Sequence, residues 1–261
     1  MPKKKVSSNP LFTIITPSFN SGKYLEETIK SVLRQTYKNI EFIVIDGGSK
    51  DNSIDIIKKY ESKISYWISE PDNGQTDAIN KGFSMAKGDL VGWLCSDDVL
   101  FENSIELIVD YVNKNSLTVD NIGVIFGNTT HFNGDTIISK TNGARINLKY
   151  ILTKNPQVIQ PGSFHSAAIL KKVGRLNEKL KYCMDYDLWI RTLKYGNSFF
   201  VNEQLAKFRV HQESKSVKDR LYFALELMKV NFRYKKNPFA PIKFLLMKRI
   251  LREWLKAIKS K

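Results

Sequence analysis

Two adjacent carboxylates, Asp97 and Asp98, end an apolar, strand-like run in the stretch GDLVGWLCSDDVLFENS. Neighbouring like charges repel, so such a pair is stable only where water, hydrogen bonds or a cation compensates it. Capping of the helix expected over VLFENSIELIVDYV would account for one carboxylate but not for both. A hard cation such as Mg²⁺ or Mn²⁺ takes one or two carboxylates together with phosphate oxygens. The pair is therefore either a solvated turn or a site for a cation, to which a diphosphate substrate would add its oxygens.

Strand-like and helix-like segments alternate on both sides of this pair. Short, nearly all-apolar runs predict buried strands, and apolar residues at helical spacing, such as Leu25, Ile29, Val32 and Leu33, predict the helices between them. The expected strands are LFTIITPSF, IEFIVIDGG, ISYWISEP and DLVGWLCSDD, and the expected helices are GKYLEETIKSVLRQT, SKDNSIDIIKKY and GQTDAINKGFSMAKG. We expect Asp51 to cap the second helix.

Strands that alternate with helices and are apolar along their whole length predict a parallel sheet with helices on both faces. Ligands then bind at the carboxyl ends of the strands. Those ends carry the stretches PSFN, DGGSKDNS, SEPDNGQ and SDD, three of which are acidic. The fold class is therefore α/β with a mostly parallel central sheet, and Asp97 and Asp98 lie where a ligand should bind.

The second half has a different pattern. Asn133 and Gly134 form the Asn-Gly signal of a hairpin, which predicts antiparallel additions to the sheet. The stretch MDYDLWIRTLKYG predicts a helix with Leu188, Trp189 and Leu193 inward. Within it, Asp187 stands next to the apolar run and is the better capping residue, which leaves Asp185 available for chemistry.

Length and composition fit a globular chain of 261 residues with 42% hydrophobic residues. The two cysteines, Cys95 and Cys183, lack metal-type spacing, and no signal peptide or run of about 18 apolar residues is visible. These features predict free thiols in a reducing compartment and no membrane span. We expect a leader at 1–10, a catalytic domain at 11–215, divided near residue 100 into nucleotide-binding and acceptor-binding halves, and an extension at 216–261.

The formal charge of +15 is concentrated in this extension, because residues 218–261 hold 13 Lys or Arg against 3 Asp or Glu, a net +10. From Pro241 the sequence can be drawn as an amphipathic helix, which suits contact with an anionic membrane surface, where each basic side chain adds about 1 kcal/mol. Packing of the apolar face on the catalytic body is the alternative. No motif supports nucleic acid as a partner. The expected apolar side is Met247, Ile250, Leu251, Trp254, Leu255 and Ile258, and the basic side is Lys248, Arg249, Arg252, Lys256 and Lys259.

Neither a P-loop nor a GxGxxG motif follows the first strand, so dinucleotide and P-loop binding are unsupported. Four segments, FTIITPSFNSGKYLEETIKSVLRQTY, EFIVIDGGSKDNS, GWLCSDD and MDYDLWIRTLKYG, together resemble family 2 glycosyltransferases of the GT-A fold, of the kind that build bacterial cell-surface polysaccharides. The resemblance spans roughly residues 11–213, with the segments in the family's order and spacing.

The resemblance implies metal-assisted transfer of a sugar from a nucleotide-diphosphate donor, with UDP-sugar expected, to an acceptor hydroxyl with inversion. The implied acceptor is a lipid-linked or polysaccharide precursor, and the implied location is the cytoplasmic face of the plasma membrane. By motif position, Asp46 would bind the base and Asp98 would bind Mn²⁺ or Mg²⁺ directly. The other implied donor-site residues are Pro17, Ser18, Asn20, Gly74, Gln75, Asn80 and Asp97.

Two further residues follow from the same resemblance. Asp185 is the implied general base, which must reach the acceptor hydroxyl on the face opposite the leaving diphosphate. His211 would reach the metal or the diphosphate, although Arg209 could pair with phosphate oxygens instead. The chain departs from the family's commonest form at Ser96 and Met184, where acidic residues often stand.

Three rival functions remain open at the level of sequence. Nucleotidyl transfer to a sugar phosphate also uses an α/β sheet and a metal, but a glycine-rich basic loop after the first strand is missing. A catalytically degenerate module that binds nucleotide-sugars or membranes is consistent with Ser96 and Met184. A nucleic-acid-binding protein would show steep salt dependence through its basic tail.

Overall fold

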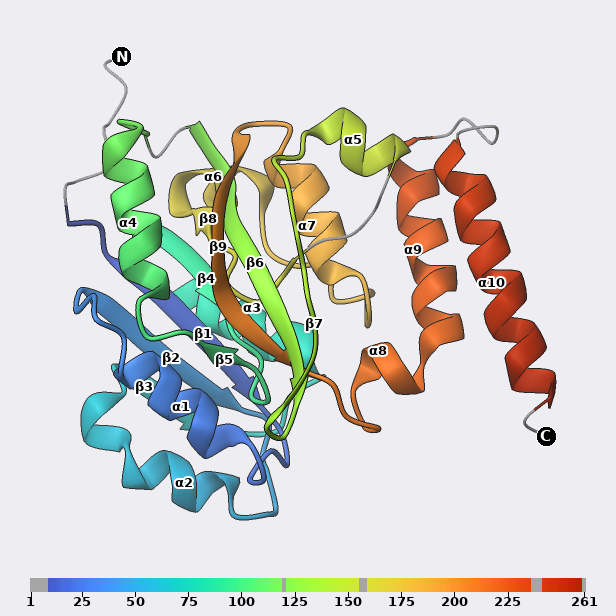
Figure 1. Cartoon of the computed structure of the whole chain (residues 1–261). Coiled ribbons are helices and arrows are strands. Elements are labelled where there is room, and N and C mark those ends of the chain that lie inside the picture. Colours follow the sequence, from blue (N-terminus) through green and yellow to red (C-terminus); the bar gives the residue numbers. More distant parts are fainter. Residues whose placement is uncertain (1–8, 119–120, 155–158, 236–240, 260–261) are drawn as a thin grey trace.

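A computed structural model describes residues 9–118, 121–154, 159–235 and 241–259 (Figure 1). The expected leader lies almost entirely outside these residues. The predicted alternation of strands and helices in the first half is confirmed. Its elements are β1 (Phe12–Ser18), α1 (Leu25–Leu33), β2 (Ile40–Asp46), α2 (Ser53–Lys59), a short 3-10 turn η1 (Glu61–Lys63), β3 (Tyr66–Ser69), α3 (Gln75–Met85) and β4 (Leu90–Trp93).

The first sheet has the strand order β3-β2-β1-β4-β8, in which β1 to β4 are parallel and β8 (His165–Ser166) pairs antiparallel with β4. Every residue of β1 and β4 is buried, as continuous apolar strands covered on both faces must be. Ser18 pairs with Asp46, and Asp46 pairs with Ser69, so these three strands end level with one another. The strand order reverses beside β1, which opens a crevice at those ends.

The predicted hairpin forms from β6 (Ile122–Asn133) and β7 (Thr136–Lys140), with Gly134 at a φ of 53°. It does not extend the first sheet, which corrects the expectation. Instead β6 pairs in parallel with β9 (Asn197–Arg209), and β5 (Val99–Leu100) completes a second sheet of order β5-β9-β6-β7. The two sheets touch where Ile125 and Phe164 exchange backbone hydrogen bonds of 2.8 Å.

The helices of the second half settle two capping assignments. The helix after the acidic pair, α4 (Ser104–Lys114), begins only after β5, so neither Asp97 nor Asp98 caps it. The helix α7 (Met184–Thr192) begins before Asp187, which therefore lies in its first turn and pairs with Arg191 at 2.8 Å instead of capping. The residues expected to face inward from α7 are buried. Two short helices, α5 (Leu148–Thr153) and α6 (Ala167–Val173), complete this half.

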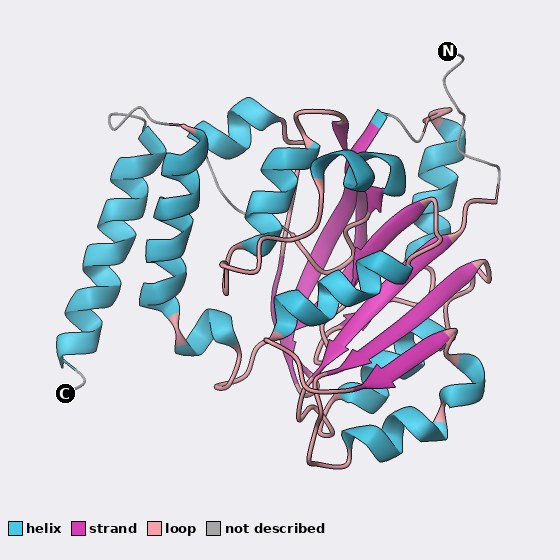
Figure 2. Ribbon diagram, turned by 180° about the vertical axis from the view of Figure 1, so that it is seen from behind, coloured by secondary structure: helices cyan, strands magenta, loops and turns pink. Residues whose placement is uncertain are grey.

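The basic extension folds into α8 (Lys215–Lys218), α9 (Arg220–Tyr234) and α10 (Pro241–Lys259). Figures 1 and 2 show α9 and α10 side by side at the end of the molecule away from β3. Leu227 and Val230 of α9, with Ile242 and Leu246 of α10, belong to the same hydrophobic core as Trp189 of α7. Among the described residues, no helix is long and apolar enough to cross a membrane.

Candidate active site

A cavity of about 2050 Å³ lies at the carboxyl ends of β1 and β4 and extends to α9 and α10. A pocket for one small ligand usually measures roughly 300–1,000 Å³, so this cavity has room for two substrates. Most of the site residues expected from the sequence line it, namely Pro17, Ser18, Asn20, Gly74, Gln75, Asp97, Asp98, Asp185 and His211.

The segment after β1 forms one wall of the cavity. The hydroxyl of Ser18 is buried there without a hydrogen-bond partner, as expected of a group that meets a ligand. Asn20 adopts a φ of 48° and holds the loop after β2, because its side-chain oxygen accepts a bond of 2.9 Å from the Lys50 N–H and its own N–H donates 2.8 Å to Ser49 Oγ. The segment after β1 and the loop after β2 are therefore held together as one unit.

Asp46, expected to bind the base, is fully buried and does not line the cavity. Its carboxylate accepts bonds from the N–H of Gly48 (3.1 Å) and Ser49 (2.9 Å) and from the hydroxyls of Ser49 (2.6 Å) and Ser69 (2.8 Å). These four hydrogen bonds hold the loop after β2 in its shape. Because the Asp46 carboxylate is buried outside the cavity, a direct contact with the base is not supported.

Asp72 is the carboxylate that lines this part of the cavity, and no motif of the sequence predicted it as a site residue. A Cβ at Gly47 would lie 2.6 Å from Asp72 Oδ2, so the glycine leaves room for this side chain. The signal was present in the acidic stretch SEPDNGQ at the end of β3, but nothing in the sequence alone showed that it would lie over Gly47.

The two polar residues expected on α3 have different positions. Gln75 lines the cavity, where its amide donates 3.2 Å to Cys95 Sγ and accepts 2.9 Å from Lys215 Nζ. Asn80 lies outside the cavity, because its side chain bonds the backbone N–H and carbonyl of Leu176 and the carboxylate of Glu178. Asn80 thus ties α3 to a neighbouring loop, which argues against its expected contact with the donor.

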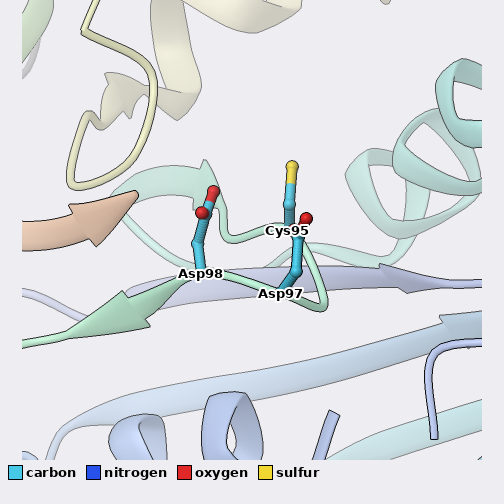
Figure 3. Close-up of side chains that lie close together, drawn as sticks. All are labelled: Cys95, Asp97 and Asp98. Atoms are coloured by element: carbon cyan, nitrogen blue, oxygen red, sulfur yellow. The ribbon is translucent and has the colours of Figure 1, made fainter. Parts of the chain in front are cut away.

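The acidic pair lies on the turn between β4 and β5, where ligand atoms of Cys95, Asp97 and Asp98 all lie within 4.8 Å of one another (Figure 3). Asp98 is 1% exposed, and burial together with the charge of Asp97 raises its pKa well above the usual value. Burial also raises the pKa of the Cys95 thiol, so the thiol stays protonated, and a bound cation would favour the ionised form of the two carboxylates. Two crowded carboxylates with a protonated thiol fit a hard, oxygen-preferring cation.

His211 faces this cluster, whereas Arg209 does not reach the cavity. Nε2 of His211 lies 2.9 Å from Asp97 Oδ2. Arg209 is buried, donates from its N–H to Asp98 Oδ1 at 3.0 Å and from Nε to the Asp97 carbonyl at 2.9 Å, and forms an ion pair with Glu27. Since its guanidinium is already engaged, the alternative role of Arg209 as a phosphate ligand is not supported.

Asp185 lies in the first turn of α7 and faces the cavity from the side of α9. Burial raises the pKa of its carboxyl to about 6, close to the value that suits a general base at neutral pH. The preceding loop is held by Glu226 of α9, whose carboxylate accepts the N–H bonds of Lys181 (3.0 Å), Tyr182 (2.7 Å) and Cys183 (2.8 Å). The sequence gave no signal for Glu226, because it lies more than forty residues from this loop.

Comparisons with known proteins show the family of the chain. The model of glycosyl transferase family 2 matches residues 13–174. An uncharacterized glycosyltransferase of Rickettsia typhi is 34% identical over 221 residues, which cover 80% of this chain and 66% of the relative. A relative from Rickettsia bellii is 32% identical, and the match covers 80% of this chain but 31% of that protein. The chain thus spans between about a third and two thirds of these relatives.

Solved structures show the same fold. TarS of S. aureus, in complex with UDP-GlcNAc, has a TM-score of 0.69 at 17% identity, covering 92% of this chain and 70% of that one. A mannosyltransferase of Pyrobaculum calidifontis, in complex with GDP-Man and Mn²⁺, has a TM-score of 0.64 at 14% identity, covering 96% and 72%. The family match and the shared architecture together show that the chain belongs to glycosyl transferase family 2 and has the GT-A fold.

Proposed function

We propose that the chain transfers a sugar, with inversion and with the help of Mn²⁺ or Mg²⁺, from a UDP-sugar to an acceptor hydroxyl. One observation carries this proposal: a single cavity joins the Asp97, Asp98 and His211 cluster to Asp185, whose pKa of about 6 suits a base. Similar architectures have been solved with UDP-GlcNAc and with GDP-Man and Mn²⁺, which supports a nucleotide-sugar donor.

Each residue has a defined task in a single displacement. The Asp185 carboxylate takes the proton of the acceptor hydroxyl while the hydroxyl oxygen bonds to the anomeric carbon. The bond from that carbon to the diphosphate oxygen breaks, and the electron pair leaves with the nucleoside diphosphate. A divalent cation held by Asp98, with Asp97 and His211 beside it, would neutralise the charge that gathers on the diphosphate. Attack opposite the leaving group inverts the anomeric carbon.

The acceptor belongs to the same proposal. We place it among lipid-linked or polysaccharide precursors at the inner face of the plasma membrane, because α10 exposes a broad apolar surface. Its exposed apolar residues are Phe244, Leu245, Met247, Leu251, Trp254 and Leu255. Basic side chains, including Lys248, Arg252 and Lys256, border this surface on the same helix. That combination suits a helix lying in an anionic interface.

Release of nucleotide tests the proposal. The purified chain is incubated with Mn²⁺ or Mg²⁺ and a panel of UDP-, GDP- and dTDP-sugars, and free nucleotide is measured. We expect metal-dependent release from a UDP-sugar. Asp185→Asn should lower the rate by roughly 10²-fold or more, as loss of a general base does, and Asp98→Asn should raise the metal concentration required. Asp110→Asn, an exposed carboxylate on α4, is the matched control.

Two results would contradict the proposal. If no donor turns over, even with a membrane lipid extract as the source of acceptor, while nucleotide still binds, the chain is a binding module. If release is equal with and without metal and is unchanged in Asp98→Asn, the acidic cluster does not assist departure of the diphosphate.

A further inference from the structure

The helix α10 presents three different faces. One packs on α9 and buries Ile242, Leu246 and Glu253. A second is apolar and exposed to solvent, with Met247, Leu251 and Trp254. The third is basic and lines the same cavity as Asp98 and Asp185. We define the basic wall as the cationic residues of α10 and the neighbouring loop that line this cavity: Lys181, Lys248, Arg249 and Arg252.

The basic wall adjoins the segment that carries the proposed base. The guanidinium carbon of Arg249 lies 5.2 Å from the ring centre of Phe223. The Phe223 carbonyl accepts a hydrogen bond of 3.7 Å from Cys183 Sγ. The Phe223 ring packs edge-on against the Tyr182 ring, with 6.5 Å between the ring centres. Tyr182 and Cys183 lead directly into Asp185. Arg249 is therefore separated from the segment that ends in the base by a single aromatic side chain, and Lys181 of the basic wall belongs to that segment.

The contacts between α9 and α7 hold this part of the cavity in place. Glu226 accepts the three loop N–H bonds described above, Tyr234 donates 2.7 Å to Asp187 Oδ1, and Asn231 donates 3.0 Å to Tyr186 Oη. Because α10 packs on α9, these bonds also fix the basic wall relative to Asp185.

The charges of the basic wall are largely unpaired. Within the part of the chain that the structure describes, Lys181, Lys248 and Arg249 form no ion pair, whereas Arg252 shares Glu253 with Lys256. Uncompensated cations on a concave surface attract an anion, and guanidinium groups suit phosphate oxygens. The carboxylates Asp72, Asp97 and Asp98 line the cavity from the loops that follow the strands, with Lys23 and Lys215 also in its lining, whereas the basic wall lies on α10 and the loop before α7.

This arrangement assigns the carboxylates and the basic wall to different substrates. The donor's diphosphate belongs with a cation at the acidic cluster, as proposed above, so the basic wall is left for the other substrate. Apolar side chains line the cavity next to the basic wall, namely Phe223, Leu227, Leu245 and Leu246. They would accommodate carbon groups attached to an anion.

We propose that the basic wall binds a phosphate group of the acceptor and thereby holds the acceptor hydroxyl at Asp185. This inference rests on the proposed transferase function and adds the chemical class of the acceptor. The phosphate can belong to a lipid headgroup or to a water-soluble glycan or polyol phosphate, since both present the same oxygens to Lys248 and Arg249.

Binding of matched probes tests this site. The full chain is saturated with UDP and Mn²⁺, so that the acidic cluster is occupied, and is titrated in a calorimeter with farnesyl phosphate, sn-glycerol 3-phosphate and farnesol. We expect the double variant Lys248→Gln with Arg249→Gln to bind the phosphate probes at least about ten-fold more weakly, since charge-assisted hydrogen bonds to both side chains are lost. Lys256→Gln removes one positive charge from α10 outside this cavity and should bind them like the parent chain.

The outcomes are distinct. Tighter binding of farnesyl phosphate than of glycerol phosphate identifies a lipid source, and equal binding identifies a water-soluble phosphate; both uphold the site. Farnesol binding as tightly as farnesyl phosphate, or an equal loss in Lys256→Gln, overturns it. Affinity for UDP with Mn²⁺ is measured in every variant, so failure of the donor site is seen separately from failure of the basic wall.

Discussion

At the scale of single residues, the chemistry of Asp185 has a cost in stability. Burial raises its pKa from 3.8 to about 6, which means that the folded chain disfavours the ionised carboxylate. A raised carboxyl pKa stabilises the folded state only at low pH, and this contribution is lost as the pH rises from about 4 to about 6. Above that range, the base is ionised and ready for catalysis, but the fold is less stable.

Asp185→Asn should therefore stabilise the chain above pH 6 while it impairs catalysis. Asparagine keeps an oxygen that can accept the Tyr186 N–H bond of 2.7 Å but carries no charge. The shift of about two pKa units limits the gain in the free energy of unfolding to roughly 3 kcal/mol, and partial exposure of the Asp185 side chain makes the gain smaller. Thermal unfolding in EDTA at several pH values measures it, with Asp110→Asn as the control. If the variant is no more stable than the parent at pH 8, burial does not disfavour the ionised Asp185 carboxylate.

Some of the residues that short motifs predicted for the site line the cavity and others do not, for a physical reason. Asp98 and Asp185 reach the cavity because Asp98 immediately precedes β5 and Asp185 lies in the first turn of α7, both beside the cavity. Asp46 and Asn80 stand in equally recognisable motifs, but nearby donors and acceptors occupy their side chains and turn them away from the cavity. Asp72 was overlooked because its position depends on the missing side chain of Gly47, a contact that only the folded chain reveals.

At the scale of elements, Glu226 links the extension to the catalytic body. Its two oxygens accept three successive N–H bonds of the loop before α7, and its charge adds to the burial that raises the pKa of Asp185. Glu226→Gln leaves only one accepting oxygen and removes the charge. We expect kcat to fall by about ten- to a hundred-fold, because small displacements of a base are costly.

The pH profile distinguishes this positioning role from a loss of folding. Removal of the negative charge lowers the pKa of Asp185, so the acidic limb of kcat/KM should move to lower pH in Glu226→Gln. Glu61→Gln, at an exposed carboxylate of η1 outside the cavity, is the matched control and should leave both kcat and the limb unchanged. An unchanged limb in Glu226→Gln would show that Glu226 has no electrostatic effect on the base.

The sequence predicted elements well where each could be recognised locally. The alternation from β1 to β4 follows from apolar runs and helical spacing within short windows. The strand β9 was not predicted, because it mixes buried Leu205 and Ala206 with exposed Asn202 and Glu203 and pairs with β6 about seventy residues away. Tertiary contacts decide such pairing. Local patterns therefore predicted neither the second sheet nor the packing of α9 beside α7.

At the scale of the whole molecule, charge and apolar surface are concentrated together at one end. Residues 218–261 carry +10 of the formal +15, and α10 turns basic side chains toward the cavity and apolar ones to solvent. Of the apolar side expected from the sequence, Met247, Leu251, Trp254 and Leu255 are exposed and Ile250 is half-buried, and the side chain of Ile258 lies outside the described residues. Packing on the body, the alternative raised for this face, involves a different face of the helix.

The exposed apolar face predicts binding to anionic vesicles that depends on α10. The double variant Leu251→Ser with Trp254→Ser should bind phosphatidylglycerol-containing vesicles at least about ten-fold more weakly, because burial of each side chain contributes roughly 1.5–3 kcal/mol when complete. Ile137→Ser with Ile138→Ser removes exposed apolar side chains from β7 and should not change binding. Co-sedimentation with vesicles, repeated at high salt, measures both the apolar and the charge contribution.

Equal binding by the α10 variant and the parent chain would show that this face does not contact the membrane. An equal loss in the β7 variant would indicate adsorption without a defined orientation. Selective loss would place the mouth of the cavity at the lipid surface, where a lipid-linked acceptor could reach Asp185 without leaving the bilayer.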